Sequence, residues 1–182
     1  MQPMFETLLK LMKEPVRPER GVKTDHSILL VYPPERELDF REQLVDNCFP
    51  AFEAQGTGFD PLDLIGFMFR GLSKDAVESL REEEFDDYRW MLQGLSRRVE
   101  ASLHARLEEL AAQHPGGNVI IHGTVALYPL VRFGEVLRGL RDLPARIALA
   151  FPGEERGGKL HFMNQPDGGN YLAVKLFWQD GR

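Results

Sequence analysis

The sequence contains a single cysteine, Cys48, among its 182 residues. One thiol cannot close an internal disulfide, and it cannot supply a cysteine-based structural zinc site. Proteins that depend on such crosslinks are therefore excluded, and a chain of this length can fold on its apolar core alone. Cys48 falls on the apolar stripe of an expected helix, which favours a buried and unreactive side chain. Scarce cysteine also predicts a reducing, cytoplasmic location.

Surplus positive charge and long apolar runs are also missing. The chain has 22 Lys and Arg residues against 28 Asp and Glu residues, which gives a net charge of −6 at pH 7. A protein that coats nucleic acid needs surplus cations to neutralise phosphates, so this balance disfavours a direct nucleic-acid partner. No run approaches the roughly 20 apolar residues of a membrane-spanning helix, and we expect no membrane association.

The glycine patterns that bind phosphates are absent as well. A GxxxxGK[ST] or GxGxxG loop would follow a buried strand, where its backbone amides cradle the phosphates. The first expected strand is followed instead by Pro33 and Pro34, which remove two amide donors. The histidines form no HxH or HExxH pair. We therefore expect no standard nucleotide cradle, no metal site and no cofactor.

What the sequence does contain is an alternation of apolar runs and helical patterns. Short continuous apolar runs are typical of strands buried on both faces, as in a parallel sheet. Their alternation with helices predicts an α/β domain of three layers, with a mostly parallel central sheet and helices on both faces. The expected strands are 27–32, 62–69, 118–122 and 146–151, and the expected helices between them cover 36–55, 88–113 and 133–140.

Both ends of the chain carry further patterns. Residues 1–13 predict an amphipathic helix that packs on its own domain or on a partner, and residues 14–25 predict a polar connector. Near the other end, 159–163 and 171–178 alternate in polarity around a Pro-Asp-Gly-Gly turn, which predicts antiparallel edge strands. We expect a single domain over residues 1–182, with its core in 26–178.

Ligands of open α/β sheets bind beyond the carboxyl ends of the strands, so residues at those ends are candidates for a site. His122 ends one expected strand and Thr124 follows it, a combination that could serve acid–base chemistry or anion binding. Glu154 and Glu155 follow another strand and could bind a cation or activate water. The preferred interpretation of each is structural: a loop hydrogen bond, a helix cap and a charged turn.

Arginines gather between the third and fourth expected strands. Such a cluster could form a local patch for an acidic partner or for nucleic acid. Acidic residues lie among them, which favours a mixed, solvated face. The four arginines are Arg132, Arg138, Arg141 and Arg146.

Several of these segments, taken in order, resemble one protein family. Residues 119–123, 127–132 and 150–154 are similar to the core signature of the BrxB family, which belongs to the BREX bacteriophage-exclusion systems. The resemblance places Tyr128 and Arg132 within a Tyr-Pro-Leu-(apolar)-Arg motif. The sequence departs from the family pattern in its Phe-Phe-Pro-Gly-Glu motif, where alanine replaces the first phenylalanine.

The resemblance extends over roughly residues 1–178 and implies a small, non-catalytic component of phage defence. Members of the family act beside a PglZ-like protein related to alkaline phosphatases, a large ATPase and a DNA methyltransferase. The resemblance carries over no catalytic residue to this sequence, and it implies no cofactor. The expected sheet is also similar to that of RecA-like ATPases without their phosphate-binding loop, by analogy of fold alone.

The first hypothesis is therefore an adaptor that helps to assemble a BREX complex and binds the PglZ-like protein. Its expected contact surfaces are the N-terminal helix, the C-terminal edge strand and the arginine-bearing face. The expected interface residues are Phe5, Leu9, Arg138, Arg141, Phe177 and Trp178.

The alternative hypothesis is a small hydrolase or nucleotide-binding enzyme with a site at the carboxyl ends of the strands. It would use His122, Thr124 and Glu154. A third hypothesis, the least favoured, is a direct DNA binder that uses the arginine-bearing face. The residues expected to bind a ligand are His122, Thr124, Tyr128, Arg132 and Glu154.

Overall fold

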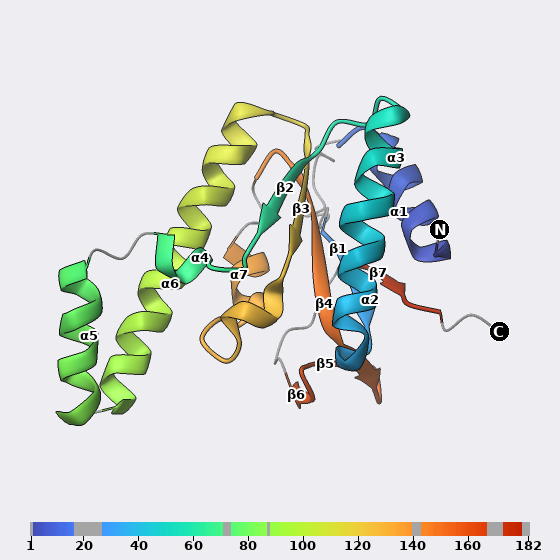
Figure 1. Cartoon of the computed structure of the whole chain (residues 1–182). Coiled ribbons are helices and arrows are strands. Elements are labelled where there is room, and N and C mark those ends of the chain that lie inside the picture. The colour runs from blue at the N-terminus through green and yellow to red at the C-terminus, as the bar shows by residue number, and fades with distance from the viewer. Residues whose placement is uncertain are drawn as a thin grey trace.

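A parallel sheet forms the centre of the fold (Figure 1). The structure is a computed structural model that describes residues 2–16, 27–70, 74–86, 88–139, 143–166 and 173–179. Within these segments the central strands lie in the order β2-β3-β4-β1-β7, and each neighbouring pair is parallel. The strands are β1 (Ile28–Tyr32), β2 (Asp60–Asp63), β3 (Asn118–His122), β4 (Arg146–Arg156) and β7 (Val174–Phe177).

The inner strands are buried on both faces, which explains their continuous apolar runs. Every residue of β1 and of β3 is buried. Because successive side chains of a strand point to opposite faces, Leu29 and Val31 enter one apolar cluster while Leu30 and Tyr32 enter the other. The prediction of a buried parallel sheet is confirmed.

Helices from the N-terminal part of the chain cover one face of the sheet (Figure 1). α1 packs there through a stripe that includes Phe5, which is 0% exposed, and Leu9, which is 7% exposed. The expectation that these two side chains contact a partner is therefore corrected: they belong to the core of their own chain. This layer consists of α1 (Pro3–Lys13), η1 (Pro34–Arg36), α2 (Glu37–Glu42), the π-helical η2 (Gln43–Cys48) and α3 (Phe49–Ala54).

Cys48 lies in this layer, as its position on the apolar stripe predicts. Its side chain is 1% exposed, and burial raises the pKa of the Cys48 thiol to about 12. Because the thiolate is the reactive form, a thiol with this pKa is unreactive near neutral pH. Cys48 is a core residue.

The opposite face of the sheet is covered by the second half of α6 and by α7 (Figure 1). Val99, Leu103 and Leu107 of α6 are buried there, whereas Trp90 near the start of the helix is 72% exposed. None of the described helices is both long enough and apolar enough to span a bilayer. The elements of this half of the chain are α4 (Phe67–Arg70), α5 (Lys74–Asp86), α6 (Tyr88–Gln113), η3 (Thr124–Leu127) and α7 (Phe133–Gly139).

The second expected strand, 62–69, is shorter than its apolar run. β2 ends at Asp63, and the chain then turns through Gly66, which has a φ of +70°. Phe67 and Met68 follow in α4, where they pack against the core from a helix. A short apolar run fits a buried strand or a buried helix equally well, which is why the sequence pattern overextends this strand.

The C-terminal region is only partly antiparallel. β5 (Lys159–Phe162) pairs antiparallel with the end of β4, and β6 (Gln165–Pro166) pairs with β5. β7 instead runs parallel to β1, so the expected antiparallel direction of 171–178 was wrong for this strand. Alternating polarity reports the pleat of a strand and carries no information on its direction. The turn expected at 166–169 falls mostly outside the described residues.

Candidate functional site

At the carboxyl edge of the sheet, the parallel register places His122 of β3 beside Asp63 of β2. His122 Nδ1 lies 3.8 Å from Asp63 Oδ1 and, among the described residues, has no hydrogen-bond partner. The residue His122 is only 4% exposed, and its ring packs against that of Phe49 at a centroid distance of 5.8 Å. The sheet therefore holds an imidazole against a carboxylate just below the surface.

Asp63 also contacts a cation and a backbone amide. Its Oδ2 accepts a hydrogen bond from Arg41 Nη2 at 3.1 Å, and its Oδ1 accepts one from the Ile65 amide at 2.9 Å. Burial lowers the pKa of His122 below its usual 6.5; Asp63 opposes this shift and Arg41 adds to it. The imidazole is therefore neutral near pH 7, and the ion pair between Arg41 and Asp63 links α2 to β2 beside it.

Thr124 fastens the end of β3 to β4. Its hydroxyl donates to the Ala150 carbonyl at 2.9 Å, and its side chain is 0% exposed. The hydroxyl makes no helix cap, because Gly123 occupies the cap position of η3. The expected cap is thus corrected, while the structural role of Thr124 stands. A fully buried hydroxyl that already has a partner is poorly placed for chemistry on a ligand.

At the carboxyl end of β1, the hydroxyl of Tyr32 is also buried and hydrogen-bonded. Its hydroxyl donates to Glu37 Oε2, and its ring stacks on Phe40 at a centroid distance of 3.8 Å. Burial, together with the nearby Glu37 carboxylate, raises the pKa of Tyr32 far above its usual range. The phenol stays protonated and acts as a hydrogen-bond donor.

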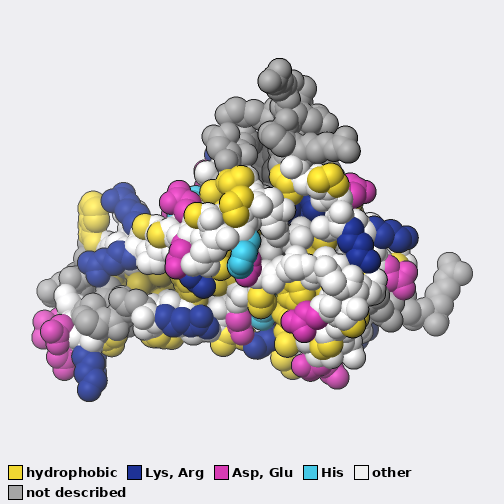
Figure 2. All heavy atoms as spheres, turned by 90° about the horizontal axis from the view of Figure 1, so that it is seen from above, with side chains coloured by type: hydrophobic (Ala, Val, Ile, Leu, Met, Phe, Trp, Pro, Cys, Tyr) yellow, Lys and Arg dark blue, Asp and Glu magenta, His cyan; other side chains and the backbone are white. Residues whose placement is uncertain are grey.

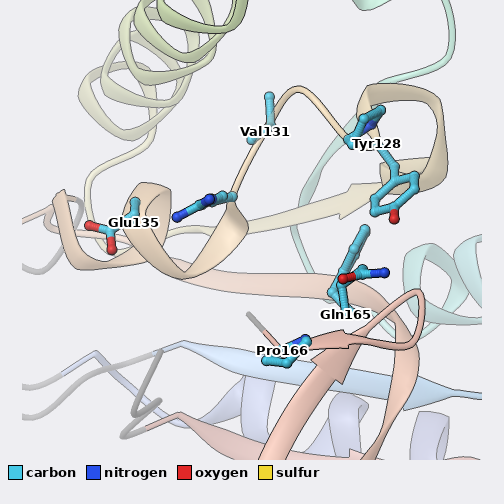
Figure 3. A pocket seen from close by; sticks show the side chains of 8 residues that line it. Tyr128, Val131, Glu135, Gln165 and Pro166 are labelled. Atoms are coloured by element: carbon cyan, nitrogen blue, oxygen red, sulfur yellow. The ribbon is translucent and has the colours of Figure 1, made fainter. Parts of the chain in front are cut away.

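Tyr128 and Arg132 do meet, but at a separate site. They line a cavity of about 320 Å³ between the segment that joins η3 to α7 and the β5–β6 hairpin (Figure 3). Phe162, which is 4% exposed, contributes an aromatic wall, with its ring centroid 6.1 Å from that of Tyr128. The lining residues are Tyr128, Pro129, Val131, Arg132, Glu135, Phe162, Gln165 and Pro166.

Glu154 is not part of either site. β4 continues past the level of its parallel neighbours, and Glu154 lies on this extension opposite His161. Its carboxylate pairs with Arg156, and Glu155 Oε1 pairs with Lys175 Nζ at 3.1 Å. The structure therefore brings Glu154 together with neither His122 nor Thr124. In the part of the chain that the structure describes, no group of three or more potential metal-ligand side chains is present.

The expected arginine-bearing face is smaller than the sequence suggests. Arg146 is 7% exposed and donates to the Glu14 carbonyl and to Asn118 Oδ1, so it belongs to the interior. Arg138 is exposed and pairs with Glu135 at 2.8 Å. Arg141 lies outside the described residues. The face of the molecule seen in Figure 2 carries both basic and acidic side chains.

At the C-terminal edge strand, the two expected anchor residues differ in their surroundings. Phe177 is 44% exposed. Trp178 is partly buried against the cluster under α1 and α2, and its ring centroid lies 6.2 Å from that of Phe40. Phe177 is therefore the aromatic residue of β7 that a partner could reach.

Sequence reasoning gave Asp63 no functional role, because its spacing matches no known motif, and it missed Arg41. Asp63 interrupts an apolar run at the point where β2 ends, and that interruption is the signal that could have found it. Arg41 lies on α2 with no distinctive spacing to Asp63 or to His122, and only the packing of α2 over the sheet brings it near. A contact of this kind has no local sequence signature.

Comparison with known proteins identifies the family. A family model described as BREX protein BrxB matches residues 64–176, which is more than half of the chain. The matched segment contains His122 and every residue that lines the cavity, whereas Arg41 and Asp63 precede it. Searches of curated proteins and of solved structures found no match. The chain belongs to the BrxB family of BREX proteins.

Proposed function

We propose that this protein is a non-catalytic assembly component of a BREX phage-defence complex and that it binds a PglZ-like partner. Membership of the BrxB family, which implies involvement in BREX defence, is the observation that carries the proposal. Other BREX components are the partners that this membership suggests. The proposed binding of a PglZ-like partner is supported by the surfaces of the chain that are exposed to a second protein.

The edge strand β7 is the surface best suited to such a contact. It ends the order of central strands, with β1 as its one neighbour among the described strands. Val174 and Phe177 are 46% and 44% exposed. An edge strand offers unpaired backbone groups to an extended segment of another protein, and an exposed aromatic side chain adds an anchor.

The positions of the candidate catalytic residues support assembly over the enzymatic alternative. His122 and Thr124 are buried, and Glu154 pairs with Arg156 on a strand extension. A hydrolase needs these groups around one reacting atom that a substrate can reach. Stabilisation by a nucleotide or a divalent metal that disappears in His122→Ala would contradict this preference.

Co-purification with the PglZ-like protein of the same BREX system tests the proposal. We expect the full-length chain to retain that protein on an affinity column and Phe177→Asp to lose it, because the substitution places a charge in the apolar contact. Leu38→Asp is the matched control, since Leu38 is a large apolar residue on α2 that is 79% exposed.

Three outcomes of this experiment differ in meaning. If the full-length chain retains no BREX component at all, the assembly role is wrong. Retention by Phe177→Asp at the level of the unsubstituted chain would move the contact away from β7. Equal loss in Leu38→Asp and Phe177→Asp would mean that the effect is not specific to the edge strand.

A further inference from the structure

The cavity beside Tyr128 combines aromatic and proline side chains with a cation, Arg132, that has no partner among the described residues. Within the described part of the chain, the Arg132 guanidinium makes no hydrogen bond or ion pair. Glu135 lines the same cavity, but its Oε2 is engaged by Arg138 at 2.8 Å. The carboxylate nearest in sequence is thus already paired, and among the described residues Arg132 keeps an unpaired positive charge in a cavity whose lining is partly polar and partly apolar.

The chemistry of this pair of features selects an anion attached to an apolar group. A guanidinium presents a planar fork of donors that matches a carboxylate in bidentate geometry. The faces of Tyr128, Phe162 and Pro166 offer apolar surface beside it. The Gln165 side chain, which has both donors and an acceptor, can pair with the backbone of an extended chain.

The shape of the cavity agrees with a short segment. Figure 3 shows the Tyr128 ring extending toward Gln165 from the opposite wall, with Pro166 on the hairpin below and Glu135 at the far end on α7. Its volume of about 320 Å³ is at the lower end of the roughly 300–1,000 Å³ of small-ligand pockets. One or two side chains of a peptide fit this size better than a large cofactor.

A phosphate group would be a poorer match than a carboxylate. Proteins hold phosphates with several backbone amides, or with more than one cation. Here Arg132 is the single uncommitted cation among the lining residues, and the carboxylate Glu135 lines the same space. With one uncommitted cation and one carboxylate in its lining, the cavity is better suited to a singly charged ligand than to a phosphate.

We propose that this cavity binds a short peptide segment of a partner protein in which an acidic side chain is next to an apolar one. Arg132 pairs with the carboxylate, and Tyr128 and Phe162 contact the apolar side chain. The proposal rests on the proposed function in one respect, because the segment would belong to another BREX component. The cavity is a site distinct from β7.

Two isosteric probes test the charge requirement without a partner protein. The isotope-labelled full-length chain is titrated with the N-acetylated, C-amidated dipeptide Phe-Asp and, separately, with Phe-Asn, while the amide signals of Tyr128 and Gln165 are followed by NMR. Phe-Asp is expected to shift these signals and to bind at least about tenfold more tightly than Phe-Asn, because the amide loses a charge-assisted pair.

Arg132→Gln should weaken Phe-Asp binding by a similar factor, and Arg132→Lys should bind with intermediate affinity because it keeps the charge without the fork. Arg106→Gln is the matched control, since Arg106 is an exposed arginine of α6 that pairs with Glu109 and does not line the cavity. It should bind Phe-Asp as the unsubstituted chain does.

The proposal is overturned if the two dipeptides bind equally, if Arg132→Gln binds Phe-Asp normally, or if inorganic phosphate shifts the same signals at lower concentration than Phe-Asp. Absence of any shift at the cavity overturns it as well. None of these results bears on retention of the PglZ-like protein through β7, so failure of the cavity and failure of the assembly role are distinguishable.

Discussion

At the end of β3, two features of the structure require glycine at position 123: the backbone conformation and the lack of space for a side chain. Its φ of +68° lies in the left-handed region, which disfavours residues with a Cβ. A Cβ at this position would also lie 2.7 Å from Asp63 Oδ1 and 3.0 Å from Ile65 Cγ1. The approach of Asp63 to His122 therefore depends on the missing side chain as much as on the turn.

Gly123→Ala is expected to lower the free energy of unfolding by about 2–5 kcal/mol, of which about 1–2 comes from the backbone and about 1–3 from the close contact. Gly56→Ala is the control, because Gly56 has a φ of +70° with no atom within 4 Å of the added Cβ. It should lose only the backbone part. Urea unfolding of both variants measures the difference, and equal losses would contradict the close-contact explanation.

His122 gives the protein a specific dependence on pH. Its pKa is lowered in the folded state, mainly by burial, so the unfolded chain takes up the proton more readily. Stability is therefore full above the unfolded pKa of about 6.5 and falls as pH drops through the window between 6.5 and the lower folded value.

We expect His122→Gln to flatten this part of the profile. The free energy of unfolding of the unsubstituted chain should fall more between pH 7.5 and pH 5 than that of His122→Gln, because glutamine cannot take up the proton. Urea titrations at several pH values give both curves. Parallel curves would show that His122 does not contribute.

The sequence predicts that α1 packs either on its own domain or on a partner, and the structure distinguishes between these two possibilities. Its apolar stripe packs against α2 and the sheet, with the Phe5 ring 5.5 Å from that of Phe40. The helix is therefore a structural part of the domain. Amphipathic periodicity alone could not distinguish this from binding to a partner, because both uses need the same stripe.

Phe5→Ala should destabilise the protein by about 3–5 kcal/mol, as expected when a fully buried aromatic side chain is removed. Lys10→Ala, at an exposed position of the same helix, should change stability by no more than about 0.5 kcal/mol. Thermal or urea unfolding gives both values. A loss in Phe5→Ala as small as that in Lys10→Ala would mean that α1 does not dock on the sheet in solution.

Elements whose formation depends on the residues within their own segment could be predicted from the sequence, whereas those that depend on pairing with distant segments could not. β3 and β1 coincide closely with their apolar runs, because burial on both faces leaves a direct mark on composition. The end of β2 and the direction of β7 depend on which distant segments pair, and no window of sequence contains that information. For the same reason His122 was found as a strand-end residue while Arg41 was not.

At the scale of the whole molecule, the two apolar clusters share one sheet. β1 and β4 each place alternate side chains in both clusters, for example Leu149 and Ala150. Neither cluster can lose its packing without disturbing the strands that support the other. This arrangement predicts that the chain unfolds as a single cooperative unit.

The two tryptophans allow that prediction to be checked. Trp90→Phe leaves Trp178 as the one remaining tryptophan, beside the cluster under α1. We expect its fluorescence and the far-ultraviolet circular dichroism to give coincident urea transitions. Fluorescence that changes at a lower urea concentration than circular dichroism would indicate two independently unfolding parts.

The position of β1 has a consequence for how the chain is made. β1 pairs with β4 and β7, and both of these strands follow it by more than 100 residues in the sequence. Pairing over such sequence separations is slow, and unpaired strand edges attract other chains. During synthesis α1 and β1 therefore emerge well before β4 and β7, and we expect their apolar side chains to be most prone to aggregation in the interval before these strands are available.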